Sequence, residues 1–218
     1  MKRTLGLTLL LFATLFSCMR QEKPLPAELS RAESVMWEHP DSALSILRSM
    51  PQSSLSSGKN YATWALLLAQ ARDKVYGKRL PDSLNIPSSD KLVQDAMDYF
   101  EKEGDLKRMA QTYYYKGQLL KDQKKITEAM PFFLKSKEMM TKLDEPLFTY
   151  LICQSLGNMY RYQDLYEESL VQLKDAYQYA LRSGNGERIS YALSELGRTY
   201  VHKNEMDSAL FYFGKSLD

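Results

Sequence analysis

A glycine recurs at a fixed interval in the second half of the chain, at Gly117, Gly157 and Gly197, each 40 residues from the next. Two further columns repeat in the same phase, one of small residues and one of large apolar residues: Ala129, Ser169 and Ala209, then Phe133, Leu173 and Phe213. Self-similarity at a period of roughly 20 to 50 residues is typical of proteins built from stacked repeats. The interval therefore restricts this chain to an array of similar units.

The columns indicate how two helices of one unit pack. Helices whose axes lie about 8–10 Å apart need small residues at the contact, and Gly117 against Ala129 and Gly197 against Ala209 meet that need. We expect Phe133 and Phe213 to fill the space between neighbouring units. This pattern resembles the tetratricopeptide repeat, a helix-turn-helix unit whose usual period is about 34 residues. The resemblance implies an all-α, right-handed α-solenoid of about five helix pairs, with clear units at 110–149, 150–189 and 190–218.

Upstream of these units the sequence also predicts helical hairpins, but these do not follow the 40-residue period. Apolar residues at helical spacing predict helices over 61–76 and 90–102. Residues 27–50 predict one further hairpin, interrupted near Pro40. We therefore expect residues 27–218 to form one domain of tetratricopeptide-like repeats.

The first 17 residues have the organisation of a secretory signal. Lys2 and Arg3 precede an apolar stretch over 5–16, whose 12 residues are too few for a membrane span of about 20 residues. The run 15–18, LFSC, resembles a bacterial lipoprotein signal, which implies that Cys18 carries palmitate-type acyl chains and that 18–26 form a tether. The alternative is an ordinary cleaved signal in which Cys18 is incidental.

Charge and composition favour binding over catalysis. Removing Lys2 and Arg3 from the 29 basic residues leaves 27, equal to the 27 acidic residues. A balanced chain lacks the basic excess on which direct nucleic-acid binding depends. With two histidines and no metal, nucleotide or nucleophile motif, we expect no cofactor and no enzymatic activity. Cys153 lies on the apolar face of a predicted helix, where a buried small hydrophobe is expected.

Candidate binding residues follow from the repeat. In a stacked array, the first helix of each unit lines a concave groove, and its inward positions hold amides, tyrosines and cations: Tyr114, Gln118, Lys121, Gln154, Asn158, Arg161, Tyr191 and Arg198. Amides bond a peptide backbone, while tyrosine and arginine contribute most strongly to interfaces. The alternative is a merely solvated face.

Three Asp-Ser-apolar triplets resemble the O-glycosylation acceptor of Bacteroidetes envelope proteins. The triplets at Asp41 and Asp207 also suit helix starts, where an acidic side chain favours the first turn. Ser83 is therefore the glycosylation candidate.

From signal to repeats, the chain resembles tetratricopeptide-repeat lipoproteins of Bacteroides-like bacteria. The resemblance implies an envelope scaffold, lipid-anchored at the outer membrane and facing the periplasm, that binds a protein or peptide partner. Longer members of that family continue into a transmembrane helix and a cytoplasmic domain. The alternative is therefore the periplasmic sensing portion of a membrane-spanning transcriptional regulator, truncated at Asp218.

Overall fold

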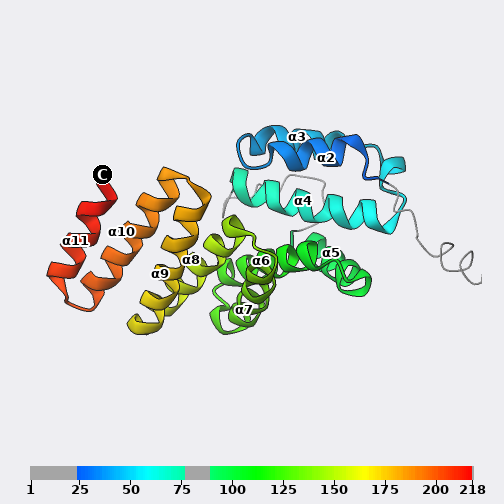
Figure 1. Ribbon diagram of the computed structural model, residues 1–218. Coiled ribbons are helices and arrows are strands. Elements are labelled where there is room, and N and C mark those ends of the chain that lie inside the picture. The colour runs from blue at the N-terminus through cyan, green and yellow to red at the C-terminus, as the bar shows by residue number, and fades with distance from the viewer. Residues whose placement is uncertain (1–23, 77–88, 218) are drawn as a thin grey trace, which may run out of the picture.

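The computed structural model describes residues 24–76 and 89–217, and these residues form ten α-helices and one short 3-10 helix, without a strand. Consecutive α-helices pair into five hairpins, as the repeat predicted (Figure 1). The elements are α2 (Ala27–Val35), α3 (Pro40–Ser49), η1 (Gln52–Leu55), α4 (Gly58–Tyr76), α5 (Ser89–Glu103), α6 (Leu106–Asp122), α7 (Ile126–Lys142), α8 (Pro146–Tyr162), α9 (Tyr166–Ser183), α10 (Gly186–His202) and α11 (Met206–Leu217).

The 40-residue period is a property of the backbone as well as of the side chains. The first helices of the last three hairpins begin at Leu106, Pro146 and Gly186, four residues before the starts at 110, 150 and 190 that the sequence suggested. The turns repeat too, because left-handed residues recur every 40 positions: Lys124, Asp164 and Asn204 within hairpins, then Gly104, Asp144 and Gly184 between them. Each unit thus reuses the same two turns.

Within each hairpin the recurring glycine allows close contact with the large residue of the second helix. A Cβ atom on Gly157 would lie 2.6 Å from Cγ of Leu173, and one on Gly197 would lie 2.7 Å from Cε1 of Phe213. The large residue therefore packs against the glycine of its own hairpin, whereas the sequence suggested that it fills the space between neighbouring units.

Buried side chains join each hairpin to the next. The largest apolar cluster extends from α2 to α8, and two smaller clusters link α8, α9 and α10, then α9, α10 and α11. Cys153 is fully buried in one of them, as predicted, and burial raises the pKa of its thiol to about 11. Stacking between neighbours, which is typical of solenoids, therefore holds the array together.

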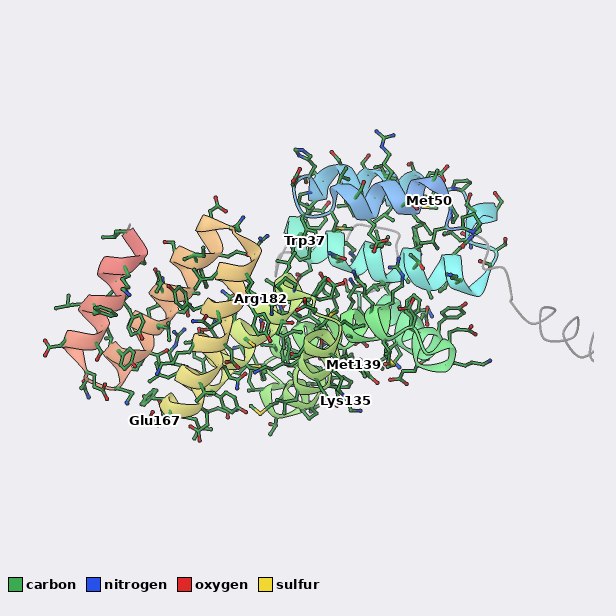
Figure 2. The ribbon with its side chains drawn as sticks, in the orientation of Figure 1. Trp37, Met50, Lys135, Met139, Glu167 and Arg182 are labelled. Atoms are coloured by element: carbon green, nitrogen blue, oxygen red, sulfur yellow. The ribbon has the colours of Figure 1, made fainter. Side chains whose placement is uncertain are left out.

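The array curves toward the first helices of the hairpins. α4 contacts α6 and α8 contacts α10, whereas within the described residues no comparable contact joins α7 to α9 or α9 to α11. Trp37 lies in the turn between α2 and α3 (Figure 2). Its ring meets that of Phe148 on α8, with centroids 5.6 Å apart. We call the inner side formed by α6, α8 and α10 the concave surface.

The pKa of Lys74 reflects its burial and a charge from a distant helix. Burial lowers the pKa of Lys74 at the end of α4 to about 8, and the positive charge of Arg188 on α10 lowers it as well. The ammonium group of Lys74 lies 3.4 Å from the ring centroid of Trp37. The last turn of α4 therefore packs against the turn between α2 and α3.

Candidate functional site

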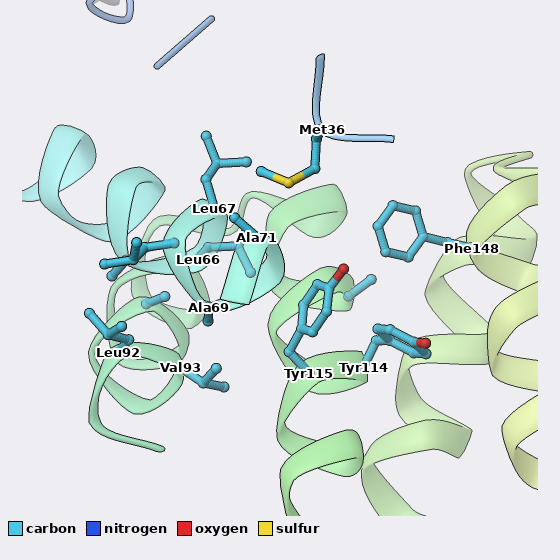
Figure 3. Packing of buried hydrophobic residues seen from close by; sticks show 14 of the residues in the cluster. Met36, Leu66, Leu67, Ala69, Ala71, Leu92, Val93, Tyr114, Tyr115 and Phe148 are labelled. Atoms are coloured by element: carbon cyan, nitrogen blue, oxygen red, sulfur yellow. The ribbon is translucent and has the colours of Figure 1, made fainter. Parts of the chain in front are cut away.

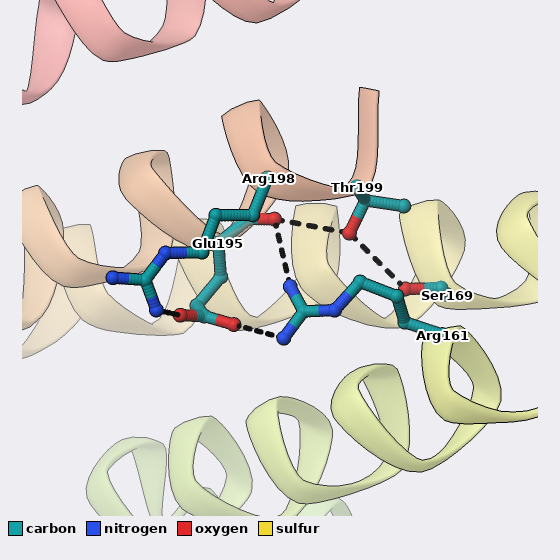
Figure 4. Close-up of polar contacts among 5 residues, drawn as sticks. All are labelled: Arg161, Ser169, Glu195, Arg198 and Thr199. Atoms are coloured by element: carbon teal, nitrogen blue, oxygen red, sulfur yellow. Dashed lines mark hydrogen bonds and ion pairs between the residues drawn. The ribbon is translucent and has the colours of Figure 1, made fainter. Parts of the chain in front are cut away.

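A buried carboxylate, Glu195 of α10, organises the concave surface between α8 and α10. Only 1% of its surface is exposed, and its two oxygens face two guanidinium groups (Figure 4). Arg161 of α8 places Nη2 2.8 Å from Oε2, while Arg198, one turn further along α10, donates from Nη1 to Oε1 over 2.6 Å. The cluster ties α8 to α10 across the boundary between two repeats.

The two arginines are held differently. Arg161 is 8% exposed, and its Nη1 also donates to the backbone carbonyl of Glu195 over 3.4 Å, so its guanidinium contacts both the carboxylate and the backbone of Glu195. The side chain of Arg198 is 57% exposed. Two cations share one carboxylate, so the surface keeps an excess positive charge, which Arg198 presents to solvent.

Tyr191 lies one turn before Glu195 on α10 and is 44% exposed. Partial burial raises the pKa of its hydroxyl, and the negative charge of Glu195 adds to that shift. The hydroxyl therefore stays protonated at neutral pH, next to an exposed guanidinium. Tyrosine and arginine are the side chains that most often dominate protein interfaces.

Asn158 of α8 completes this part of the surface. Its side chain is half-buried, and its Oδ1 atom is buried without a hydrogen-bond partner among the described residues. An acceptor in this state costs about 1–3 kcal/mol unless a donor reaches it. Gln154, one turn earlier on α8, is also half-buried. Asn158 and Gln154 thus add two half-buried amides to α8, one and two turns before Arg161.

The predicted residues on α6 form a separate group. Tyr114 is only 4% exposed, and its ring packs against Tyr115 and Phe148 (Figure 3). Gln118 donates to the Tyr114 hydroxyl over 2.8 Å, and Lys121 bonds Gln118 in turn. Tyr114 is thus a packing residue between α6 and α8, and we leave it out of the candidate surface.

The structure therefore brings together five of the eight predicted residues and adds one. Gln154, Asn158, Arg161, Tyr191 and Arg198 gather around the boundary of α8 and α10, with Arg161 locked in an ion pair. Glu195 was missed, although its column in the repeat offered a signal. The equivalent positions hold Tyr115 and Ser155, so an acid there is an unusual choice for a buried position.

Several predictions fall elsewhere. Cys18 and Ser83 lie outside the described residues. Asp41 and Asp207 occupy the first turns of α3 and α11, as expected of helix starts.

Within residues 24–76 and 89–217, no helix is both long enough and apolar enough to span a bilayer. The same residues gather no set of three His, Cys, Asp or Glu side chains suited to a metal ion.

Comparison with known proteins identifies the fold through structure alone. The sequence matches no known protein family, and no curated protein resembles it. A Rap protein complexed with Competence and Sporulation Factor superposes with a TM-score of 0.70 at 13% identity, over 94% of this chain and 57% of its own. RapI in its apo form gives 0.66 at 17% identity, over 87% and 67%.

A third neighbour is a signal transduction ATPase from Pyrococcus horikoshii with a tetratricopeptide repeat sensor. It superposes with a TM-score of 0.67 at 18% identity, over 87% of this chain and 28% of its own length. All three similarities concern the fold. This protein is a tetratricopeptide-like helical-repeat solenoid.

Proposed function

We propose that this protein is a non-enzymatic interaction scaffold that binds a protein or peptide on the part of the concave surface formed by α8 and α10. The observation that carries the proposal is the Glu195 cluster. It holds Arg198 in an exposed position near Tyr191, and the neighbouring helix α8 carries the amides of Gln154 and Asn158. A guanidinium, a phenol and an amide suit an extended chain, which offers carbonyl, N–H and side-chain groups together.

Two structural neighbours support a binding role. The Rap protein is described in complex with Competence and Sporulation Factor, and the Pyrococcus ATPase has its repeats as a sensor. Envelope anchoring through lipidated Cys18, with the repeats facing the periplasm, belongs to the same proposal and rests on the signal-like residues 1–18. The second candidate is the periplasmic sensing portion of a membrane-spanning transcriptional regulator, which the sensor role of the repeats in the Pyrococcus ATPase favours. Both functions use the same surface.

Capture of the partner by variants tests the surface. Tyr191→Ala combined with Arg198→Gln should lower recovery of the partner from cells of the organism by roughly tenfold or more, because both changes remove interface anchors. The readout is quantitative mass spectrometry of material purified with the tagged protein. Val171→Ala on α9 is the matched control, since Val171 is 57% exposed on a second helix of the repeat. Equal recovery with both proteins would contradict the proposal.

A further inference from the structure

The column of the repeat that contains Arg198 is accessible in each of the three regular units. Its members, Gln118 of α6, Asn158 of α8 and Arg198 of α10, follow one another at 40 residues and are all half-buried or exposed. Asn158 keeps part of its surface open although α10 packs beside α8. The column is therefore open to a ligand between neighbouring units, and it carries a charge only at Arg198.

The charge of Arg198 is not cancelled by its neighbours. α8 has no acidic residue, and Arg161 is its single charged residue. The guanidinium of Arg161 already contacts the carboxylate of Glu195, so this one negative charge is shared by two cations. Among the described residues Arg198 donates through Nη1 alone, to Glu195, which leaves its Nε and Nη2 for another acceptor (Figure 4).

Glu195 also orders Arg198 before any ligand arrives. Nη1 of Arg198 lies 2.6 Å from Oε1 of Glu195, and Glu195 is itself fixed by Arg161 of α8. A side chain that is already ordered loses less conformational entropy when a partner binds it. The free edge of a guanidinium matches a carboxylate, which can accept two parallel N–H bonds.

Two exposed tyrosines flank the Glu195 cluster. The ring of Tyr162, at the end of α8, is centred 5.9 Å from Cζ of Arg161, and 79% of Tyr162 is exposed. Tyr191 is 44% exposed and shares a face of α10 with Arg198, because residues seven apart lie on one side of a helix. At 1.5 Å per residue the two side chains start about 10 Å apart, a distance that an extended chain covers in about three residues.

We infer that the partner segment carries an acidic side chain that pairs with Arg198, about three residues from an apolar side chain that packs on Tyr191. This inference rests on the proposed function and adds the chemistry of the ligand to it. The carboxylate belongs to a side chain inside the segment, because exposed residues lie on both sides of Arg198 along α10, Tyr191 before it and His202 after it. Glu187, one turn before Tyr191, is exposed and repels an acid at that end.

Peptide selection followed by a double-mutant cycle tests the inference. Random peptides displayed on phage are selected on the tagged full chain, and enriched sequences are synthesised with an amidated C-terminus, which removes the terminal carboxylate. We expect an Asp or Glu at a constant position, and its change to the amide should weaken binding about tenfold or more. With Arg198→Gln the same change should matter less than about twofold, because the pair is already broken. Lys174→Gln is the matched control, since it removes one exposed cation from α9 and should leave the tenfold effect intact.

Tyr191→Ala separates this inference from the proposed function. Peptides that this variant binds tenfold more weakly, but whose acid is dispensable or couples equally to Arg198 and Lys174, would overturn the inference alone. Peptides that bind only with a free C-terminus would overturn it as well, because the carboxylate recognised would be the terminal one. If no peptide is enriched, or if the enriched peptides are indifferent to Tyr191→Ala, the proposed function fails and the inference fails with it.

Discussion

At the scale of single residues, Glu195 is the feature that gives the concave surface its chemistry. A carboxylate that is 1% exposed would be costly alone, and Arg161 and Arg198 supply its counter-charges. Thr199 adds a second link, because its hydroxyl donates to the carbonyl of Glu195 over 3.0 Å and lies 3.4 Å from the hydroxyl of Ser169 on α9. Glu195 and Thr199 thus connect α10 to α8 and α9 respectively.

Replacing Glu195 should show which arginine is structural. Glu195→Gln keeps the shape but leaves Arg161 buried without a counter-charge, so we expect the free energy of unfolding to fall by about 3 kcal/mol. Arg198→Gln should cost less than about 1 kcal/mol, because exposed ion pairs contribute little. Urea denaturation followed by circular dichroism measures both. Similar losses in the two variants would show that the buried pair has no special role.

Residue types predicted where the candidate surface lies, but they did not predict which of its side chains are buried. Arg161 and Tyr114 have the chemistry of binding residues, yet one is held in a buried ion pair and the other packs in the core. The position of Arg161 in the sequence does not predict its ion pair, because its partner Glu195 lies in the next repeat, 34 residues away. Contacts between repeats can be inferred only once the stacking is known.

At the scale of elements, the glycine column controls how closely the two helices of a hairpin pack. Gly157→Ala would place a methyl group 2.6 Å from Cγ of Leu173 and 3.4 Å from the carbonyl oxygen of Ser169. The backbone cannot move away easily, since α8 and α9 pack over their whole length. The change therefore tests the packing that defines the repeat.

We expect Gly157→Ala to lower the free energy of unfolding by about 1–3 kcal/mol through overpacking. Gly186→Ala is the control, because a Cβ on Gly186 meets nothing within 4 Å, and the gain in helix propensity is at most about 1 kcal/mol. Thermal denaturation of the two variants gives the comparison. A Gly157→Ala variant as stable as Gly186→Ala would refute the close-contact role of the column.

The helices were largely predictable and their boundaries less so. The predicted helices over 61–76 and 90–102 appear as Gly58–Tyr76 and Ser89–Glu103. A period fixes the spacing of units but leaves their starting point free, which explains the offset of four residues at Leu106, Pro146 and Gly186. The residues with left-handed backbone conformation mark the turns between helices. Two of these residues, Lys124 and Asp164, are not glycine, so the sequence does not reveal the turns they form.

At the scale of the whole molecule, curvature turns separate helices into one binding surface. The first helices of the hairpins face inward, since α4 contacts α6 and α8 contacts α10. A partner bound there would touch several repeats at once. Positions on the second helices, such as Val171 and Leu134, face away and stay exposed.

Site-specific photo-crosslinking in the organism that makes the protein tests the central claim most directly. A photoreactive amino acid is placed at Gln154 or Tyr191 on the concave surface, and at Val171 or Leu134 as outer controls of comparable exposure to Tyr191. Our account predicts one discrete adduct, the same from both concave positions and absent from both controls. Adducts from the outer positions alone, or none from Gln154 and Tyr191, would contradict the claim that the concave surface binds the partner.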